Sequence, residues 1–276
     1  MTSSPTPESA KLIECKACKA MIEPTDAEAN LMVCPKCGRH FRASARQRIA
    51  FTADPGSFEE THTQLRTADP LQFAVGGETY GQRIDRAMKQ SGLSEALITG
   101  FARIQDQPCV LGAMDSSFIM ASMGSALGER FCRAVRDAVA RHCPLVVFAA
   151  SGGARMQEGT VALMQMAKTA DAVRQMKEAG LPYISILTDP TSGGVFASFS
   201  TLGDFIVAEP GAYVGFAGTR LIEGALKVKL PEGFQKSEYQ FKNGFLDDIV
   251  PRTEMRSYLG RLLLYLSKPL QKVAQN

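Results

Sequence analysis

The sequence predicts an α/β protein with mostly parallel strand pairing, preceded by a small cysteine-rich module. Apolar runs of strand length alternate with helical patterns between residues 96 and 216, a rhythm typical of α/β folds. Two of these runs stop abruptly at glycine pairs, Gly152-Gly153 and Gly193-Gly194. The module is predicted by four cysteines that fall in two closely spaced pairs before residue 38.

The chain divides into three expected regions. Residues 1–10 are rich in Ser, Thr and Pro and are expected to be a disordered leader, residues 11–48 form the cysteine module, and residues 51–276 form one large domain. Strands are expected at residues 96–104, 109–114, 118–123, 145–150, 183–187, 205–208 and 213–216. Helices are expected at residues 125–142, 158–179 and 195–202.

Composition excludes several classes of protein. The chain has 276 residues, 45% of them hydrophobic, with a net charge of +3 and a pI near 8.4. This mild basic bias fits an anionic ligand such as a nucleotide but does not by itself indicate nucleic-acid binding. No apolar run is long enough for a membrane helix, and the N-terminus lacks the pattern of a secretory signal. A cytoplasmic protein without a membrane contact is therefore expected.

The four N-terminal cysteines have the spacing of metal ligands. Cys15 and Cys18 form one C-x2-C pair, and Cys34 and Cys37 form another, followed by Gly38. Each pair fits one tight turn, and two such turns close a tetrahedral site without an open coordination position. We therefore expect a structural Zn²⁺, with iron or a redox-active pair as the alternatives. The remaining cysteines, Cys109, Cys132 and Cys143, are expected to be small buried side chains.

Two glycine turns are the candidate reaction site. Ser151–Gly159 follows the strand expected at 145–150, and Thr188–Gly194 follows the strand expected at 183–187. Glycine pairs let the backbone approach a ligand and turn successive N–H groups toward it. Two such turns can hold an oxygen that becomes negative during a reaction, as an oxyanion hole does. The alternative is that both are ordinary turns between a strand and a helix.

The histidines argue against a Ser/His hydrolase. His40 lies in the cysteine module, His62 in a segment without a clear pattern, and His142 at the end of an expected helix. None accompanies a motif-borne serine or cysteine in the way of a catalytic triad. Neither a P-loop nor a G-x-G-x-x-G fingerprint is present. What remains is a site of backbone donors, which suits enolate chemistry in which the base arrives with the substrate.

The order of these motifs resembles the carboxyltransferase beta subunits of the multisubunit acetyl-CoA carboxylases. The resemblance begins near residue 11 and covers most of the chain. It is carried by the following segments: 33–38 (VCPKCG), 151–158 (SGGARMQE), 188–195 (TDPTSGGV), 208–212 (AEPGA), 215–218 (GFAG), 230–239 (LPEGFQKSEY) and 244–247 (GFLD). One departure is Thr219, where the family usually has proline.

The resemblance implies a crotonase-like (ClpP/crotonase) domain with an N-terminal zinc ribbon. It implies transfer of CO2 from carboxybiotin to acetyl-CoA, the first committed step of fatty acid synthesis, with the biotin ureido anion as the base. Gly193 and Gly194 are the first expected oxyanion donors, with Gly152 and Gly153 as companions. The expected substrate contacts are Arg155, Phe216, Gly218 and Arg220, although for Arg155 a salt bridge at a helix entry is an equal alternative.

The resemblance also implies partners. A carboxyltransferase alpha subunit is expected to complete the active site in an alpha2-beta2 heterotetramer. The chain has neither a biotin-attachment motif nor an ATP-binding motif, so biotin carboxyl carrier protein and biotin carboxylase are expected to be separate members of an ATP-dependent complex.

Two alternatives stay open, of which the first belongs to a different class of protein. The basic residues around the cysteines and the segment from Arg39 to Arg48 allow a zinc-ribbon nucleic-acid-binding protein, although acidic residues dilute this charge and Phe41 is the one aromatic available for stacking. The other alternative is a different crotonase-fold activity, namely hydrolysis or decarboxylation of a CoA thioester, which would not require biotin. The ribbon itself is interpreted as a lid or docking element over the acyl-CoA site.

Overall fold

A central sheet organises the large domain of the computed structural model, which describes residues 12–273. The main path runs β12-β10-β9-β8-β7-β6-β3, and β11 pairs with β9. The strands from β7 to β12 pair in parallel, whereas β6 and β3 are antiparallel. Their bounds are β3 Glu59–Thr61, β6 Leu97–Ile104, β7 Gln107–Met114, β8 Leu145–Ser151, β9 Tyr183–Ser192, β10 Phe205–Ala208, β11 Val214–Gly215 and β12 Asp248–Ile249. The predicted α/β fold is confirmed, and the predicted leader lies outside the described residues.

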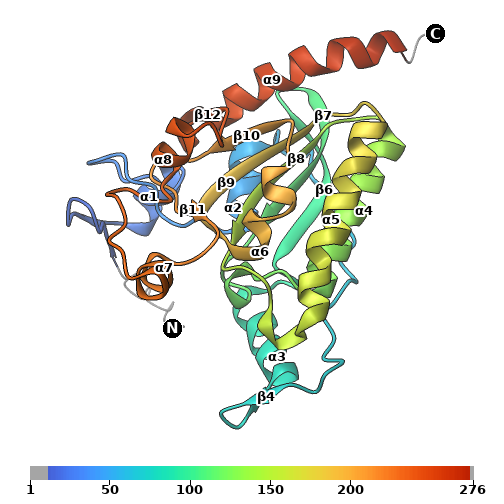
Figure 1. The fold of residues 1–276 in the computed structure, drawn as a ribbon. Coiled ribbons are helices and arrows are strands. Elements are labelled where there is room, and N and C mark those ends of the chain that lie inside the picture. Colours follow the sequence, from blue (N-terminus) through green and yellow to red (C-terminus); the bar gives the residue numbers. More distant parts are fainter. Residues whose placement is uncertain (1–11, 274–276) are drawn as a thin grey trace, which may run out of the picture.

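Helices cover both sides of this sheet (Figure 1). The long helices α4 (Ser125–Arg141) and α5 (Thr160–Glu178) pack side by side on one side. Helices α2 (Ala45–Thr52) and α9 (Arg252–Val273) contact each other and also strands β6 and β7. Leu127, Phe131 and Val135 of α4, spaced four residues apart, are buried, whereas Val139, the next residue in this series, is 36% exposed. The three buried side chains contribute to the core between helix and sheet.

Shorter elements complete the chain. They are β1 Ile13–Glu14, β2 Met21–Ile22, α1 Pro24–Ala29, β4 Ala74–Val75, β5 Glu78–Thr79, α3 Tyr80–Ser91, η1 Ile119–Ala121, η2 Met156–Glu158, α6 Gly193–Phe196, η3 Phe199–Thr201, α7 Thr219–Leu226 and α8 Ser237–Lys242. No helix among the described residues is both long and apolar enough to cross a bilayer. The scattered Cys109, Cys132 and Cys143 are buried, as predicted.

The strand predicted at residues 118–123 is wrong. This segment forms the short turn η1, in which Ile119, Met120 and Ala121 have φ values of 45°, 55° and 50°. Three successive residues with side chains in the left-handed region are unusual because their β-carbons crowd the backbone. The apolar composition suggested a strand, but this segment turns back against the glycine turn after β8. The helix predicted at 195–202 is also divided, into α6 and η3.

Arg252 attaches the cysteine module to the large domain. Its Nη1 donates to the carbonyl oxygens of Leu31, Met32 and Phe41 at 3.0, 3.0 and 3.1 Å. Its Nε and Nη2 donate to the carboxylate of Glu209, each at 2.7 Å. Burial raises the pKa of Glu209, but the attraction of Arg48 and the hydrogen bonds of Arg252 dominate and hold that pKa well below its usual value. Helix α2 continues across the domain boundary that the sequence suggested.

Candidate functional site

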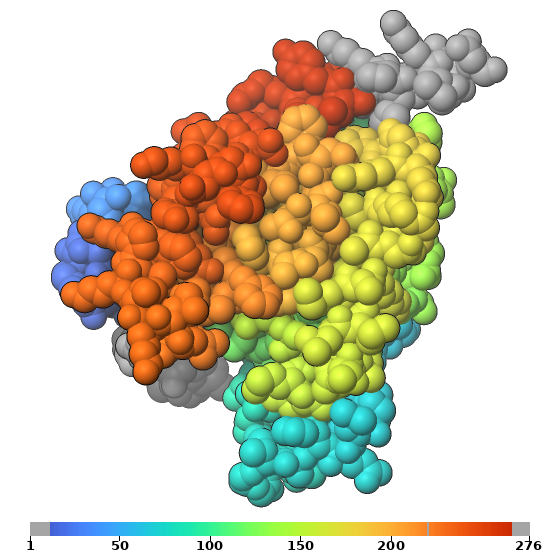
Figure 2. Space-filling model, in the orientation of Figure 1, coloured from blue at the N-terminus to red at the C-terminus, as the bar shows by residue number. Residues whose placement is uncertain are grey.

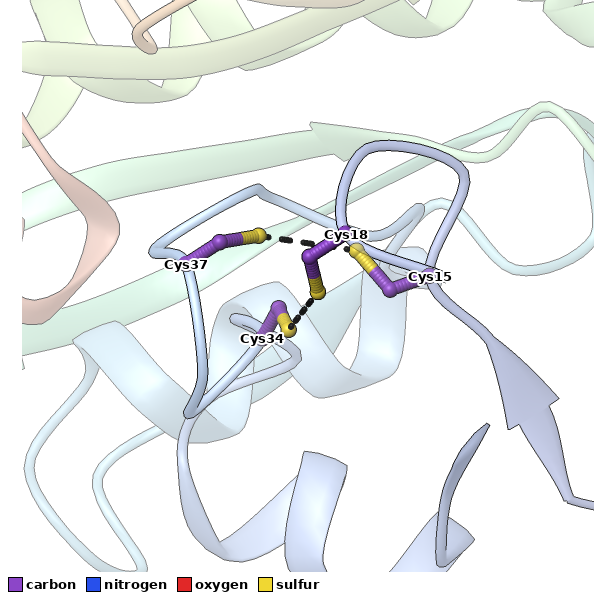
Figure 3. Close-up of side chains that lie close together, drawn as sticks. All are labelled: Cys15, Cys18, Cys34 and Cys37. Carbon is purple, nitrogen blue, oxygen red and sulfur yellow. Dashed lines mark hydrogen bonds between the residues drawn. The ribbon is translucent and has the colours of Figure 1, made fainter. Parts of the chain in front are cut away.

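The four N-terminal cysteines converge on one point (Figure 3). All four sulfur atoms lie within 4.8 Å of one another, with Cys15 Sγ 3.6 Å from Cys37 Sγ and Cys18 Sγ 3.8 Å from Cys34 Sγ. A tetrahedron with bonds of about 2.3 Å has edges of about 3.8 Å, so these contacts fit four thiolates around one metal ion. Each pair closes a tight turn, with Lys19 N donating to Cys15 O and Gly38 N to Cys34 O. Gly38, which follows the second pair, has a left-handed backbone with φ 74°.

The two glycine turns meet at the carboxyl end of the sheet. A β-carbon added to Gly193 would lie 2.7 Å from Cα of Gly153, closer than real side chains approach a backbone. Both residues also have positive φ, 60° at Gly193 and 119° at Gly153, so glycine is required at both for conformation as well as space. Ser192 Oγ joins the turns further by donating to Ser151 O at 2.9 Å. The sequence correctly identified two turns that form one structural unit.

Three of the four glycine amides are already engaged within the chain. Gly152 N donates to Met120 O at 2.8 Å, Gly153 N to Ser151 Oγ at 2.9 Å, and Gly193 N to Phe216 O at 2.9 Å. These three were predicted as oxyanion donors, and the structure corrects that prediction because an amide that donates to the protein is not free for a ligand. The engaged amides fix the shape of the turns.

Gly194 presents the remaining amide. No acceptor for Gly194 N is found among the described residues, since it lies in the first turn of α6, where helical N–H groups lack partners. Ala154 N is likewise without an acceptor in the described part of the chain. It lies 3.6 Å from the point where a β-carbon on Gly194 would be. One unengaged amide from each turn therefore lies at the junction.

Arg155 fixes the first turn through a buried side chain. Its side chain is fully buried, and Nη2 lies 2.7 Å from Glu95 Oε1. Every nitrogen of the guanidinium donates within the chain, to Glu95, Thr67, Tyr80 and Ser122. Burial raises the pKa of Glu95, but the positive charge of Arg155 outweighs it and lowers that pKa overall. The salt-bridge alternative thus describes this arginine, and its predicted contact with substrate is corrected.

The other predicted substrate contacts surround the second turn. Phe216 is 61% exposed, and its carbonyl holds the Gly193 amide. Gly218 is exposed and precedes α7, in which Thr219 is the first residue and Arg220 the second. The side chain of Arg220 lies outside the described part of the structure. Phe216 and Gly218 therefore stay candidates for ligand contact.

Sequence reasoning missed three participants at this site. Met120 accepts from Gly152, Ala154 contributes an unengaged amide, and Glu95 neutralises Arg155 from 60 residues earlier in the chain. The glycine-turn motif itself includes Ala154, so the turn could have suggested its amide. Nothing local predicts Glu95 or the left-handed turn at Met120.

The contacts of the histidines do not involve the glycine turns. His62 Nε2 lies 2.8 Å from Asp137, and His142 follows the end of α4. His40, in the cysteine module, lies beside Glu209 of the large domain. The basic residues that favoured nucleic-acid binding are also partly neutralised, since Lys19 pairs with Glu14, Arg46 with Glu60 and the buried Arg48 with Glu209. These pairs reduce the free positive charge that a nucleic-acid surface requires.

Comparisons with known proteins identify the family of the chain. The family described as carboxyl transferase domain matches residues 39–230. A Heliobacterium modesticaldum protein named acetyl-coenzyme A carboxylase carboxyl transferase subunit beta is 50% identical, over 91% of this chain and 93% of its own length. A Natranaerobius thermophilus protein named for the beta and alpha subunits together is 46% identical over 91% of this chain, which spans 41% of that longer protein.

A solved structure shows the same fold. The crystal structure of transcarboxylase 12S, with methylmalonyl-coenzyme A and methylmalonic acid bound, matches with a TM-score of 0.68 at 22% identity. The match covers 80% of this chain and 41% of the transcarboxylase chain. The large domain therefore has the crotonase-like α/β fold of carboxyl transferases.

Proposed function

Because this chain belongs to the family of acetyl-coenzyme A carboxylase carboxyl transferase beta subunits, we propose that it provides the acyl-CoA side of biotin-dependent carboxyl transfer. The proposed reaction moves CO2 from carboxybiotin to acetyl-CoA and forms malonyl-CoA for fatty acid synthesis. The observation that carries the proposal is the junction of the two glycine turns, where Gly194 N lacks an acceptor among the described residues and lies beside Ala154.

The backbone of this junction would stabilise the enolate of the substrate. Gly194 N would donate to the thioester oxygen as negative charge develops there, with Ala154 N as the second donor. Donors fixed before the reaction are effective because they do not reorganise during it. The rigid frame is supplied by the engaged amides of Gly152, Gly153 and Gly193. Carboxybiotin, delivered on a biotin carboxyl carrier protein and charged by a biotin carboxylase, would supply both the CO2 and the base.

An alpha subunit would cover the surface around this junction. Apolar side chains exposed there include Met156, 82% exposed beside Arg155, and Met120, 48% exposed against Gly152. Helix α5 adds Leu163 and Met164, 55% and 65% exposed. Large exposed apolar side chains in one region often mark contact surfaces. The fused Natranaerobius relative, whose name includes both subunits, supports an alpha subunit as the partner. The assembly that we propose is alpha2-beta2.

The cysteine module would hold a structural Zn²⁺. Four thiolates with nearly tetrahedral sulfur contacts leave no position for a substrate. Arg252 links the module's carbonyl oxygens to the buried Glu209, so loss of the ion is expected to loosen the attachment to the large domain. Metal analysis of the purified chain, with and without a chelator, tests both the identity of the ion and this link.

The function is tested by a carboxyl-transfer assay with the candidate alpha subunit added and withheld. Malonyl-CoA formation that requires both chains and carboxybiotin is the expected result. Turnover of acetyl-CoA without biotin would instead favour hydrolysis or another reaction of the thioester.

The contact surface is tested by a charge placed on α5. Met164→Glu is expected to prevent association with the alpha subunit, because a buried unpaired carboxylate is strongly unfavourable at an interface. The matched control is Val139→Glu near the opposite end of the same helical layer, where the side chain is 36% exposed. Equal association of both variants in analytical ultracentrifugation would contradict the assigned surface.

A further inference from the structure

A cavity of about 860 Å³ lies between the cysteine module and the large domain. The module contributes Lys16, Arg39 and Arg42 to its lining, and the large domain contributes Asp189, Gly211 and Lys236. Figure 1 shows the module beside the segment that carries β11, α7 and α8, and Figure 2 shows both at the same edge of the molecule. The carboxyl-transfer site described above does not explain this cavity.

Two buried nitrogen atoms in the lining lack hydrogen-bond partners. They are Arg48 Nε and His40 Nδ1, whose side chains are 4% and 8% exposed. His40 Nδ1 lies 3.6 Å from Glu209 Oε2, too far for a hydrogen bond. The carboxylate of Glu209 already accepts from Arg48 Nη1 and from Arg252. Buried polar atoms are normally satisfied, so these two unpartnered nitrogens indicate a place that suits a polar ligand atom.

The cations at the rim are also unpaired, whereas the anions are occupied. Within the described part of the chain, Lys16, Arg39 and Arg42 have no acidic partner. Glu14 pairs with Lys19 at 3.3 Å, and Asp189 Oδ1 accepts from Tyr213 N at 2.9 Å. The cavity therefore presents a surplus of positive charge and unused donors, the chemistry that recognises phosphate groups.

The cavity and the glycine junction lie along the same strand. Asp189 in β9 lines the cavity and stands four residues before Gly193. Four residues of extended chain span at most about 13 Å. A thioester placed at Gly194 N would carry its nucleotide phosphates on a long, flexible pantetheine arm. One acyl-CoA molecule can therefore reach both places.

We propose that this cavity binds the phosphate groups at the nucleotide end of the acyl-CoA substrate, with Lys16, Arg39 and Arg42 as the phosphate ligands. The assignment rests on the proposed function, since it takes acyl-CoA as the substrate. It gives the cysteine module a direct part in substrate affinity, in addition to its metal-dependent fold.

The kinetic test compares two substrates in the complex with the alpha subunit. The double variant Arg39→Ala/Arg42→Ala is expected to raise KM for acetyl-CoA by roughly tenfold or more, since two charge-assisted contacts to phosphate are removed. KM for acetyl-pantetheine, which lacks the nucleotide, should stay unchanged, as should kcat. The matched control is Arg261→Ala, an exposed arginine on α9 that does not line the cavity.

A binding test separates this proposal from the proposed function. Adenosine 3′,5′-bisphosphate is titrated calorimetrically into the full chain, with inorganic phosphate as a second probe. The wild type and Arg261→Ala should bind the nucleotide, the double variant should bind it at least tenfold more weakly, and acetyl-CoA should displace it. This measurement needs no turnover, so it gives an answer even if the carboxyl-transfer assay fails.

Three results would overturn the proposal. The first is an equal rise of KM for both substrates, which would indicate a general loss of structure. The second is nucleotide affinity unaffected by the double variant. The third is a bound nucleotide that acetyl-CoA does not displace, which would assign the cavity to a separate anionic effector.

Discussion

The turn after β8 and the turn after β9 both place two successive glycines at the end of a buried strand. In the first, Gly152 N and Gly153 N both donate within the chain, and the buried Arg155 fixes the residues that follow. In the second, Gly193 N donates to Phe216, and Gly194 N has no acceptor among the described residues. The comparison shows that two similar motifs have different roles. The first turn mainly supports the structure of the junction, and the second presents the main hydrogen-bond donor, the amide of Gly194.

The largest expected effect comes from breaking the support of the first turn. Arg155→Met should lower the free energy of unfolding by about 3–5 kcal/mol, because Glu95 is left buried and unpaired. Adding Glu95→Gln should recover part of that loss, and urea denaturation measures both. KM for acetyl-CoA of the folded fraction should not change. A higher KM with unchanged stability would restore Arg155 as a substrate contact.

The next effect separates the two turns by activity. Gly194→Val keeps the amide but adds a β-carbon that would lie 3.3 Å from Met166 Sδ and 3.4 Å from Ala154 Cβ, so the turn must shift and displace the donor. Carboxyl transfer should fall by about 10²–10³-fold, the usual magnitude for one oxyanion donor. Gly152→Val, at an exposed position with an engaged amide, should cost less than about tenfold. Circular dichroism and metal content verify folding. Equal losses would remove the distinction between the turns.

A pH effect follows from the lowered pKa of Glu95. Because its folded pKa lies below its unfolded value, its contribution to stability is present above the ordinary glutamate value of about 4.3 and is lost as pH falls through the folded pKa. Below about pH 4, the stability of the wild type should therefore fall more steeply than that of Glu95→Gln, by up to about 1.4 kcal/mol per pH unit. Parallel slopes in urea denaturation would show that this carboxyl does not titrate as described.

The smallest effect concerns the segment that holds the second turn. Thr219 is the first residue of α7, a position where proline is favourable, and Gly218 before it has φ −56° and ψ 137°, which proline tolerates. Thr219→Pro should raise the free energy of unfolding by about 0.4–1 kcal/mol by restricting the unfolded chain. A loss of stability in thermal denaturation would mean that the amide of Thr219 is needed.

The sequence was sufficient where the chemistry is local. The spacing of Cys15, Cys18, Cys34 and Cys37 predicted the cluster because two short turns determine where the sulfurs lie. Alternation of apolar runs predicted the sheet, and parallel strands necessarily bring their terminal turns to one edge. That geometry is why the glycine turns could be expected to meet.

Long-range partners could not be predicted from local patterns. The acceptor of Gly152 N is Met120 O, which lies in a left-handed turn. The apolar composition of this segment led to the wrong prediction of a strand. The partner of Arg155 is Glu95, which lies just before β6 and is brought near because β6 pairs with β7 and β7 pairs with β8. A glycine pair indicates that the backbone is accessible, but the use of each amide depends on acceptors supplied by the whole fold.

The central claim concerns one backbone amide, and residue-resolved hydrogen exchange tests it directly. In the chain labelled with ¹⁵N, Gly194 N–H should exchange quickly alone, and it should become protected when a CoA thioester analogue that mimics the enolate binds the complex with the alpha subunit. The amides of Gly152, Gly153 and Gly193 should be protected throughout. Protection of Gly194 N–H in the free chain, or no change when the analogue binds, would contradict the account.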